Sequence, residues 1–150
     1  MGRNSLKVYL DTNVLLDIIS TIERPSVKAS LIIFEAVRND KMEAVLSTQS
    51  ILDAAYILSK EDGYTPELFT RQILYLLNHL NVRSIDSAHL REALILPSGD
   101  LEDNAQYALA DSEGCDILVT SDRSFRRDRT STGLPVFTPE ELGARMTEKE

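Results

Sequence analysis

The sequence predicts one α/β domain, a three-layer α/β/α sandwich around a central, mainly parallel sheet. Short apolar runs typical of buried strands alternate with longer segments of helical periodicity along the whole chain. Strands separated by helices run parallel and are covered on both faces. A length of 150 residues, 43% of them hydrophobic, suits one folded domain with a substantial core.

The first half of the chain carries two expected strands and four expected helices. The clearest helix start is Thr65-Pro66-Glu67, which combines a capping hydroxyl, a proline in the first turn and an early acid. The expected elements are a strand at Leu6–Leu10, helices over 13–20 and from Pro25 or Ser26 to Arg38, a strand at Ala44–Leu46, a helix from Ser47 or Thr48 to Lys60, and a helix from Pro66 to Leu80.

The second half continues the alternation. Asp86 caps a helix that ends before Pro97, and Asp100 opens a helix that Gly114 ends. The remaining expected elements are strands at Val82–Ile85, Ile117–Thr120 and Pro135–Phe137, followed by a helix from Thr138. One domain is expected over residues 1–145, with a flexible tail over 146–150.

Composition excludes several classes of protein. Cys115 is the only cysteine, so no internal disulfide forms. No apolar run approaches the roughly 20 residues of a membrane span, and the N-terminal residues lack the apolar stretch of a secretory signal. We therefore expect a cytoplasmic protein without a membrane association.

The chain is acidic, with 24 Asp and Glu against 16 Lys and Arg and a net charge of -8. This argues against a sequence-reading nucleic-acid binder, which needs basic surface for phosphate contacts. Divalent ions held by carboxylates would cancel the charge locally, so a metal-dependent nuclease stays compatible with the composition.

Two strands end in acids. Asp11 follows the strand Leu6–Leu10, and Asp122 follows Ile117–Thr120 and the hydroxyl of Ser121. Carboxyl ends of strands in an open α/β sheet border the crevice in which such folds bind ligands. These positions predict an acidic pocket for a divalent metal, in which the Thr120 or Ser121 hydroxyl orients water or a phosphate oxygen.

Two further acids join this prediction. Asp53 stands in an otherwise apolar helix, where an unpaired inward carboxylate is costly. Asp103 lies one turn into a helix with a small-residue face, which allows it to approach the strand carrying Asp122. Oxygen ligands of this kind suit Mg²⁺ or Mn²⁺, and no zinc spacing is present.

Each acid also has a structural interpretation that the sequence leaves open. Asp11 can cap the following helix, and Asp53 can belong to a polar stripe with Gln49 and Lys60. Asp100 and its acidic neighbours can stabilise a helix N-terminus, and Asp122 can lie in an ordinary polar loop.

Several motifs together resemble the PIN domain family. They are Leu10–Asp17, Asp103 opening an alanine-rich helix, Gly114–Asp122 followed by Phe125, and the ending Val136–Leu142. The resemblance covers nearly the whole chain. It implies a three-layer α/β/α, metal-dependent ribonuclease, and many small bacterial members are toxins of toxin–antitoxin pairs.

The resemblance also implies a site. The four acids of the family correspond to Asp11, Asp53, Asp103 and Asp122, supported by the hydroxyls of Thr12 and Thr120. They would hold one or two Mg²⁺ or Mn²⁺ ions that activate water to hydrolyse an RNA phosphodiester. The second family position is usually Glu, and here it is Asp53; compensation by Asp100 is a hypothesis. Candidate substrate contacts are Thr12, Ser121, Arg123, Arg126 and Arg127, with Arg129 in the same basic cluster.

Two other functions remain open. The departure at Asp53 allows a catalytically weak PIN-like module that binds a protein, and a phosphoryl-transfer receiver would use Asp11 as acceptor, although no lysine follows a late strand for it. Expected partners are RNA, an antitoxin docked as an amphipathic segment, and a second copy of the chain. The apolar run Leu74–Leu77 favours a homodimer.

Overall fold

Five parallel strands form the central sheet of the computed structural model, which describes residues 5–96, 99–127 and 133–148. Their order across the sheet is β3-β2-β1-β4-β5. The strands are β1 at Leu6–Leu10, β2 at Met42–Ser47, β3 at Asn81–Arg83, β4 at Ile117–Val119 and β5 at Val136–Phe137.

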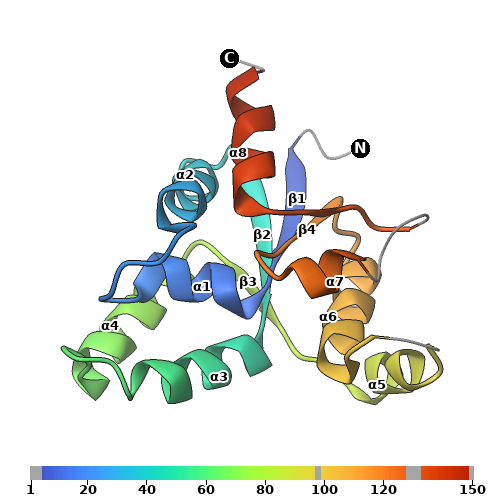
Figure 1. Cartoon of the computed structure of the whole chain (residues 1–150), viewed down its shortest axis with the longest axis horizontal. Helices are drawn as coiled ribbons and strands as arrows, with labels where there is room; N and C mark the ends of the chain where they lie inside the picture. Colours follow the sequence, from blue (N-terminus) through green and yellow to red (C-terminus); the bar gives the residue numbers. More distant parts are fainter. Residues whose placement is uncertain (1–4, 97–98, 128–132, 149–150) are drawn as a thin grey trace.

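Helices cover both faces of this sheet, so the predicted three-layer α/β/α class is confirmed. Figure 1 shows the sheet nearly edge-on, with α1 to α4 on one side and α5 and α6 on the other. The helices are α1 at Thr12–Ile19, α2 at Val27–Arg38, α3 at Thr48–Leu58, α4 at Pro66–Leu77, α5 at Ser87–Leu94, α6 at Leu101–Ser112, α7 at Arg123–Arg127 and α8 at Pro139–Glu148.

The strand order contains a topological switch point. The chain adds β2 and β3 on one side of β1 and then returns to place β4 and β5 on the other side. The connections that leave β1 and β4 therefore diverge, and a crevice opens at the carboxyl ends of these two strands.

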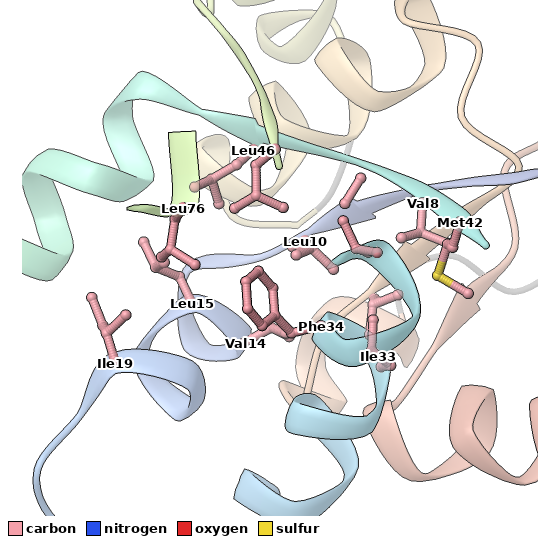
Figure 2. Close-up of a cluster of buried hydrophobic side chains, with 14 of the residues drawn as sticks. Val8, Leu10, Val14, Leu15, Ile19, Ile33, Phe34, Met42, Leu46 and Leu76 are labelled. Carbon is pink, nitrogen blue, oxygen red and sulfur yellow. The ribbon is translucent and has the colours of Figure 1, made fainter. Parts of the chain in front are cut away.

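Side-chain alternation along β1 divides the core into two halves. Val8 and Leu10 face α1 and α2 and pack with Val14 and Ile33 (Figure 2). Tyr9 points to the opposite face and packs in a second cluster that includes Leu109 of α6. Because all of these side chains are fully or almost fully buried, β1 is held in place from both sides.

Two helices begin directly at strand ends. Asp11 caps α1 immediately after β1, and its side chain accepts a hydrogen bond from the Thr12 backbone N–H. Ser47 is the last residue of β2 and caps α3 by accepting from the Ser50 backbone N–H. With no loop between strand and helix, the first turns of α1 and α3 stand at the carboxyl edge of the sheet.

The structure differs from the sequence prediction in some boundaries. Residues Arg123–Arg127 form a short helix that the sequence analysis does not predict. Helix α4 ends at Leu77, three residues before the predicted end, and Leu80 is buried. Helix α8 extends to Glu148 and thus into the predicted tail, and Met146 packs against the main core; the flexibility of the tail stays a prediction. Within the described residues, no helix is both long and apolar enough to cross a bilayer.

A buried ion pair fixes α1 against α2 and the segment between them. Asp17 is 4% exposed; its Oδ1 lies 2.9 Å from Arg24 Nε, and its Oδ2 accepts a 2.7 Å hydrogen bond from Ser30 Oγ. Removal of one partner from a buried ion pair leaves the other charge without compensation, which destabilises the fold. We expect Asp17→Ala to lower the free energy of unfolding by about 3 kcal/mol, measured by urea denaturation.

The exposed pair between Arg38 and Glu35 provides the control, because its Nη2–Oε1 contact of 2.6 Å lies on the surface. Glu35→Ala should leave the unfolding midpoint unchanged, since solvent screens such pairs. Equal stability of Asp17→Ala and the wild type would contradict the anchoring role.

Candidate active site

An open cleft of about 520 Å³ lies at the carboxyl edge of the sheet, beside the start of α1, the second half of α3 and the N-terminal half of α6. Six of the twelve residues that line it are acidic, and none of these twelve is Lys or Arg. The lining residues are Asp11, Thr12, Asn13, Leu16, Asp53, Tyr56, Ile57, Asp100, Glu102, Asp103, Gln106 and Asp122.

Asp11 forms the floor of the cleft and is 6% exposed. Its Oδ2 accepts hydrogen bonds from Thr120 Oγ1 at 2.7 Å and from Asn13 Nδ2 at 3.0 Å, and its Oδ1 accepts one from the Thr12 backbone N–H at 2.7 Å. Asp11 therefore caps α1, which confirms the capping interpretation, and it also lines the cleft; its role as a metal ligand stays a prediction.

Thr120 and Asn13 link the ends of β1 and β4. Asn13 Nδ2 donates to Thr120 Oγ1 at 3.2 Å, and Asn13 Oδ1 accepts from the Ser121 backbone N–H at 3.1 Å. Thr120 Oγ1 also accepts from the Asp122 backbone N–H at 3.0 Å. These bonds fix the backbone that carries Asp122 relative to Asp11.

Asp103 enters the cleft from α6, as predicted, and Asp100 has a different role. Asp100 is the N-cap of α6, and its Oδ1 accepts from the backbone N–H groups of Glu102 and Asp103 at 2.8 and 3.2 Å. This agrees with the capping interpretation of Asp100, although its side chain also borders the cleft.

Asp53 reaches the cleft from α3, where Gln49 Nε2 donates to its Oδ1 at 2.8 Å. The polar stripe considered for Asp53 is therefore real on the Gln49 side. Asp53 also shares a hydrogen bond with the carboxyl group of Glu102 on α6. Glu102 is thus an acid that interacts directly with Asp53, while compensation by Asp100, which lines the same cleft, stays a hypothesis.

The crowded carboxylates disfavour their own ionisation. Burial, followed by repulsion from Asp11, Asp100, Asp122 and Glu102, raises the pKa of Asp103 to about 7. Burial also raises the pKa of Asp11, although hydrogen bonds from Thr120, Thr12 and Gln106 oppose this shift. Burial and the charge of Asp53 raise the pKa of Glu102. The cleft thus carries negative charge that its lining residues leave uncompensated.

The donor atoms of the cleft fit a divalent cation of the Mg²⁺ or Mn²⁺ type. They are carboxylate and amide oxygens, with no His or Cys among the lining residues. In the described ranges, no three acidic, His or Cys side chains converge closely enough to form a preassembled metal site. The carboxylates would have to draw closer together around a cation, and metal binding by these residues stays a prediction.

Of the candidate substrate residues that the structure describes, only some lie at the cleft. Thr12 lines the cleft, whereas Ser121 and Arg123 are exposed and do not belong to its lining. The side chains of Arg126 and Arg127, and the whole of Arg129, lie outside the described residues.

Sequence reasoning missed six residues of the cleft: Asn13, Leu16, Tyr56, Ile57, Glu102 and Gln106. Gln106 follows Asp103 by three positions and therefore shares its helix face, a spacing that could have identified it. Asn13 lies two positions after Asp11, within the motif Leu10–Asp17. Glu102 and Tyr56 carry no signal in the sequence, because only the approach of α3 to α6 brings them into the cleft.

Fold and cleft together define an α/β/α domain whose oxygen-rich, acidic site suits a divalent cation and a phosphate ester. A family model described as "PIN domain" matches residues 7–124. The chain belongs to the PIN domain family, which confirms the resemblance noted in its motifs.

The chain is similar to a curated ribonuclease over nearly its whole length. Ribonuclease VapC1 of Aquifex aeolicus (strain VF5) is 32% identical over 144 residues, which cover 93% of this chain and 94% of that protein.

Solved structures share the fold at lower identity. A chain of VapBC2 from Rickettsia felis, crystallised with a promoter DNA fragment, has a TM-score of 0.59 and 19% identity, covering 89% of this chain and 98% of its own. VapC20 of Mycobacterium tuberculosis, a sarcin-ricin loop cleaving toxin, has a TM-score of 0.60 and 12% identity. The match covers 85% of this chain and 99% of that chain.

The raised pKa of Asp103 predicts a pH-dependent stability. Its pKa rises from 3.8 to about 7, so between these values the folded protein holds a proton that the unfolded chain has released. The metal-free protein should therefore lose stability as the pH rises from about 4 to about 7. We expect Asp103→Asn to flatten this dependence in urea denaturation with a chelator present.

Asp111→Asn is the matched control, because Asp111 is exposed on the same helix. It should keep the wild-type slope of stability against pH. Parallel profiles for the wild type and Asp103→Asn would show that Asp103 titrates near its ordinary value.

Proposed function

We propose that this chain is a divalent-metal-dependent endoribonuclease and the toxin of a toxin–antitoxin pair. The observation that carries the proposal is the meeting of Asp11, Asp53, Asp103 and Asp122 in one cleft, although they lie on four separate parts of the chain. The 32% identical relative is named a ribonuclease and spans almost the same length, which supports the activity.

Asp11, Asp103 and Asp122 would hold the metal, with Asp53 and Glu102 at the outer side of the cleft. A bound Mg²⁺ or Mn²⁺ supplies a Lewis acid and lowers the pKa of a water molecule. Thr120 and Asn13 keep the Asp11 carboxylate in place through bonds of 2.7 and 3.0 Å. The Thr12 hydroxyl borders the cleft and would orient water or a phosphate oxygen, whereas the buried Thr120 hydroxyl is engaged by Asp11 and supports that carboxylate.

The wall of the cleft formed by α3 offers a contact for a nucleobase. Tyr56 lines the cleft and is 66% exposed. Lys60 Nζ lies 4.5 Å from the centre of its ring and donates a 3.0 Å hydrogen bond to its hydroxyl. An aromatic ring beside a cation suits single-stranded RNA, since bases stack on the ring and phosphates approach the ammonium group.

The exposed apolar side chains of α2 and α4 support a protein partner. Leu31 and Ile32 on α2 and Leu74 and Leu77 on α4 are each 44–60% exposed. The contact between Phe34 and Tyr75 shows that the two helices lie together. An antitoxin segment or a second copy would cover this surface. Size-exclusion chromatography with light scattering tests the predicted homodimer.

RNA cleavage tests the proposed activity. The wild type should cleave single-stranded RNA with Mn²⁺ or Mg²⁺ and stop when EDTA removes the metal. We expect Asp11→Asn to reduce the cleavage rate by about 100-fold or more. Removal of a residue that only hydrogen bonds to a metal ligand typically costs about 10–100-fold, and removal of the ligand itself should cost at least as much. Single-turnover cleavage of a labelled RNA measures this rate.

Asp111→Asn again serves as the control and should cleave at the wild-type rate, because Asp111 lies outside the cleft. If the wild type and Asp11→Asn cleave equally, the activity does not come from this cleft. If neither cleaves RNA nor binds Mn²⁺ in calorimetry, the catalytically weak interaction module becomes the better description.

Tyr56 provides a separate test of the substrate side. Tyr56→Ala should raise KM for RNA about tenfold, because a base–aromatic stack contributes about 1–3 kcal/mol. Tyr56→Phe keeps the ring and should stay close to the wild type. An unchanged KM in Tyr56→Ala, together with weaker binding of a protein partner, would assign this wall to the partner and not to RNA.

A further inference from the structure

Gln106 is a buried amide on the side of the cleft formed by α6. It is 3% exposed and yet borders the cleft, one helical turn after Asp103. Its Oε1 accepts a 3.1 Å hydrogen bond from the Tyr9 hydroxyl, and its side chain also hydrogen bonds to the Asp11 carboxylate. Gln106 thus links a buried tyrosine hydroxyl to a buried carboxylate.

Tyr9 determines which way this amide points. Tyr9 is fully buried between β1 and α6, and burial raises the pKa of its hydroxyl, which stays a neutral donor. With Oε1 occupied by the Tyr9 O–H group, the Gln106 NH₂ group is directed to Asp11. A carboxylate can only accept hydrogen bonds, so this orientation is the favourable one.

This bond differs in origin from the other bonds to Asp11. Thr12 and Asn13 belong to the same helix start as Asp11, and Thr120 follows the neighbouring strand. Gln106 alone among these donors belongs to α6, the helix that carries Asp103. The Tyr9–Gln106–Asp11 chain therefore connects the two acids that would share a cation.

We propose that Gln106, oriented by Tyr9, is a positioning residue that holds the Asp11 carboxylate in register with Asp103 for metal binding. This inference rests on the proposed function, because it concerns the same metal-binding acids. Hydrogen-bonded partners of metal ligands typically change affinity by 10–100-fold when they are removed. The cost here falls on metal binding more than on RNA binding, because Gln106 is buried and acts on the Asp11 carboxylate.

Calorimetric titration with Mn²⁺ tests this role directly. Gln106→Leu has a similar volume but makes no hydrogen bond, and we expect Mn²⁺ affinity to fall about tenfold. Tyr9→Phe frees the amide to rotate and should weaken Mn²⁺ binding in the same direction, by less. Because both act through one path, the double variant should bind Mn²⁺ as Gln106→Leu does, and not with the sum of the two losses.

Cleavage kinetics separate positioning from a general loss of structure. At fixed subsaturating Mn²⁺, Gln106→Leu should lower kcat and leave KM for RNA unchanged, and added Mn²⁺ should restore most of kcat. Gln72→Leu is the matched control. Gln72 donates a 3.3 Å hydrogen bond to the Ile19 carbonyl, and neither residue lines the cleft, so its loss should leave Mn²⁺ affinity unchanged.

Each outcome has one meaning. A folded Gln106→Leu with wild-type Mn²⁺ affinity overturns the positioning role while the proposed function stands. If Gln106→Leu does not fold, Tyr9→Phe decides in the same way. If the wild type binds no Mn²⁺, or Asp11→Asn binds it equally well, the proposed metal site fails and the positioning role fails with it.

Discussion

The pairing register of β1 and β4 determines the whole site. Leu10 lies opposite Val119, and the Asp11 backbone N–H donates to the Val119 carbonyl at 3.0 Å. The residues that follow these strands, Asp11 and Thr120, therefore stand side by side at the switch point of the sheet. A shift of one residue would turn Asp11 away from the cleft, because successive strand side chains point to opposite faces.

This register has an electrostatic cost, because it places Asp11 in a buried position near other acids. Asp11 is buried next to other acids, which opposes its ionisation, and its hydrogen-bond donors only partly offset this. The cost is borne by apolar packing elsewhere, since Val8, Tyr9 and Leu10 are fully buried on both faces of the strand. The buried strand β1 thus holds the Asp11 carboxylate in a position where its ionisation is disfavoured.

The sequence alone predicted what local patterns determine. Strand and helix alternation predicted the layers, and acids that follow the ends of buried strands predicted the places of Asp11 and Asp122. Asp103 followed from the small-residue face of its helix. Contacts made by distant segments were beyond reach: the proximity of Glu102 to Asp53, the Gln106 bond to Asp11 and the exposure of Tyr56 depend on how α3 and α6 approach each other.

The acidity of the chain and an RNA substrate are compatible for a physical reason. Without a cation, the cleft repels phosphate, and Asp103, with a pKa of about 7, keeps part of its proton at neutral pH. In the proposed function, a divalent cation would have to displace that proton, so metal binding and proton release would be coupled. The same cation would change the sign of the local potential and allow the phosphate to approach. Net charge therefore describes the metal-free surface, and the proposed metal-bound form would present a different potential to RNA.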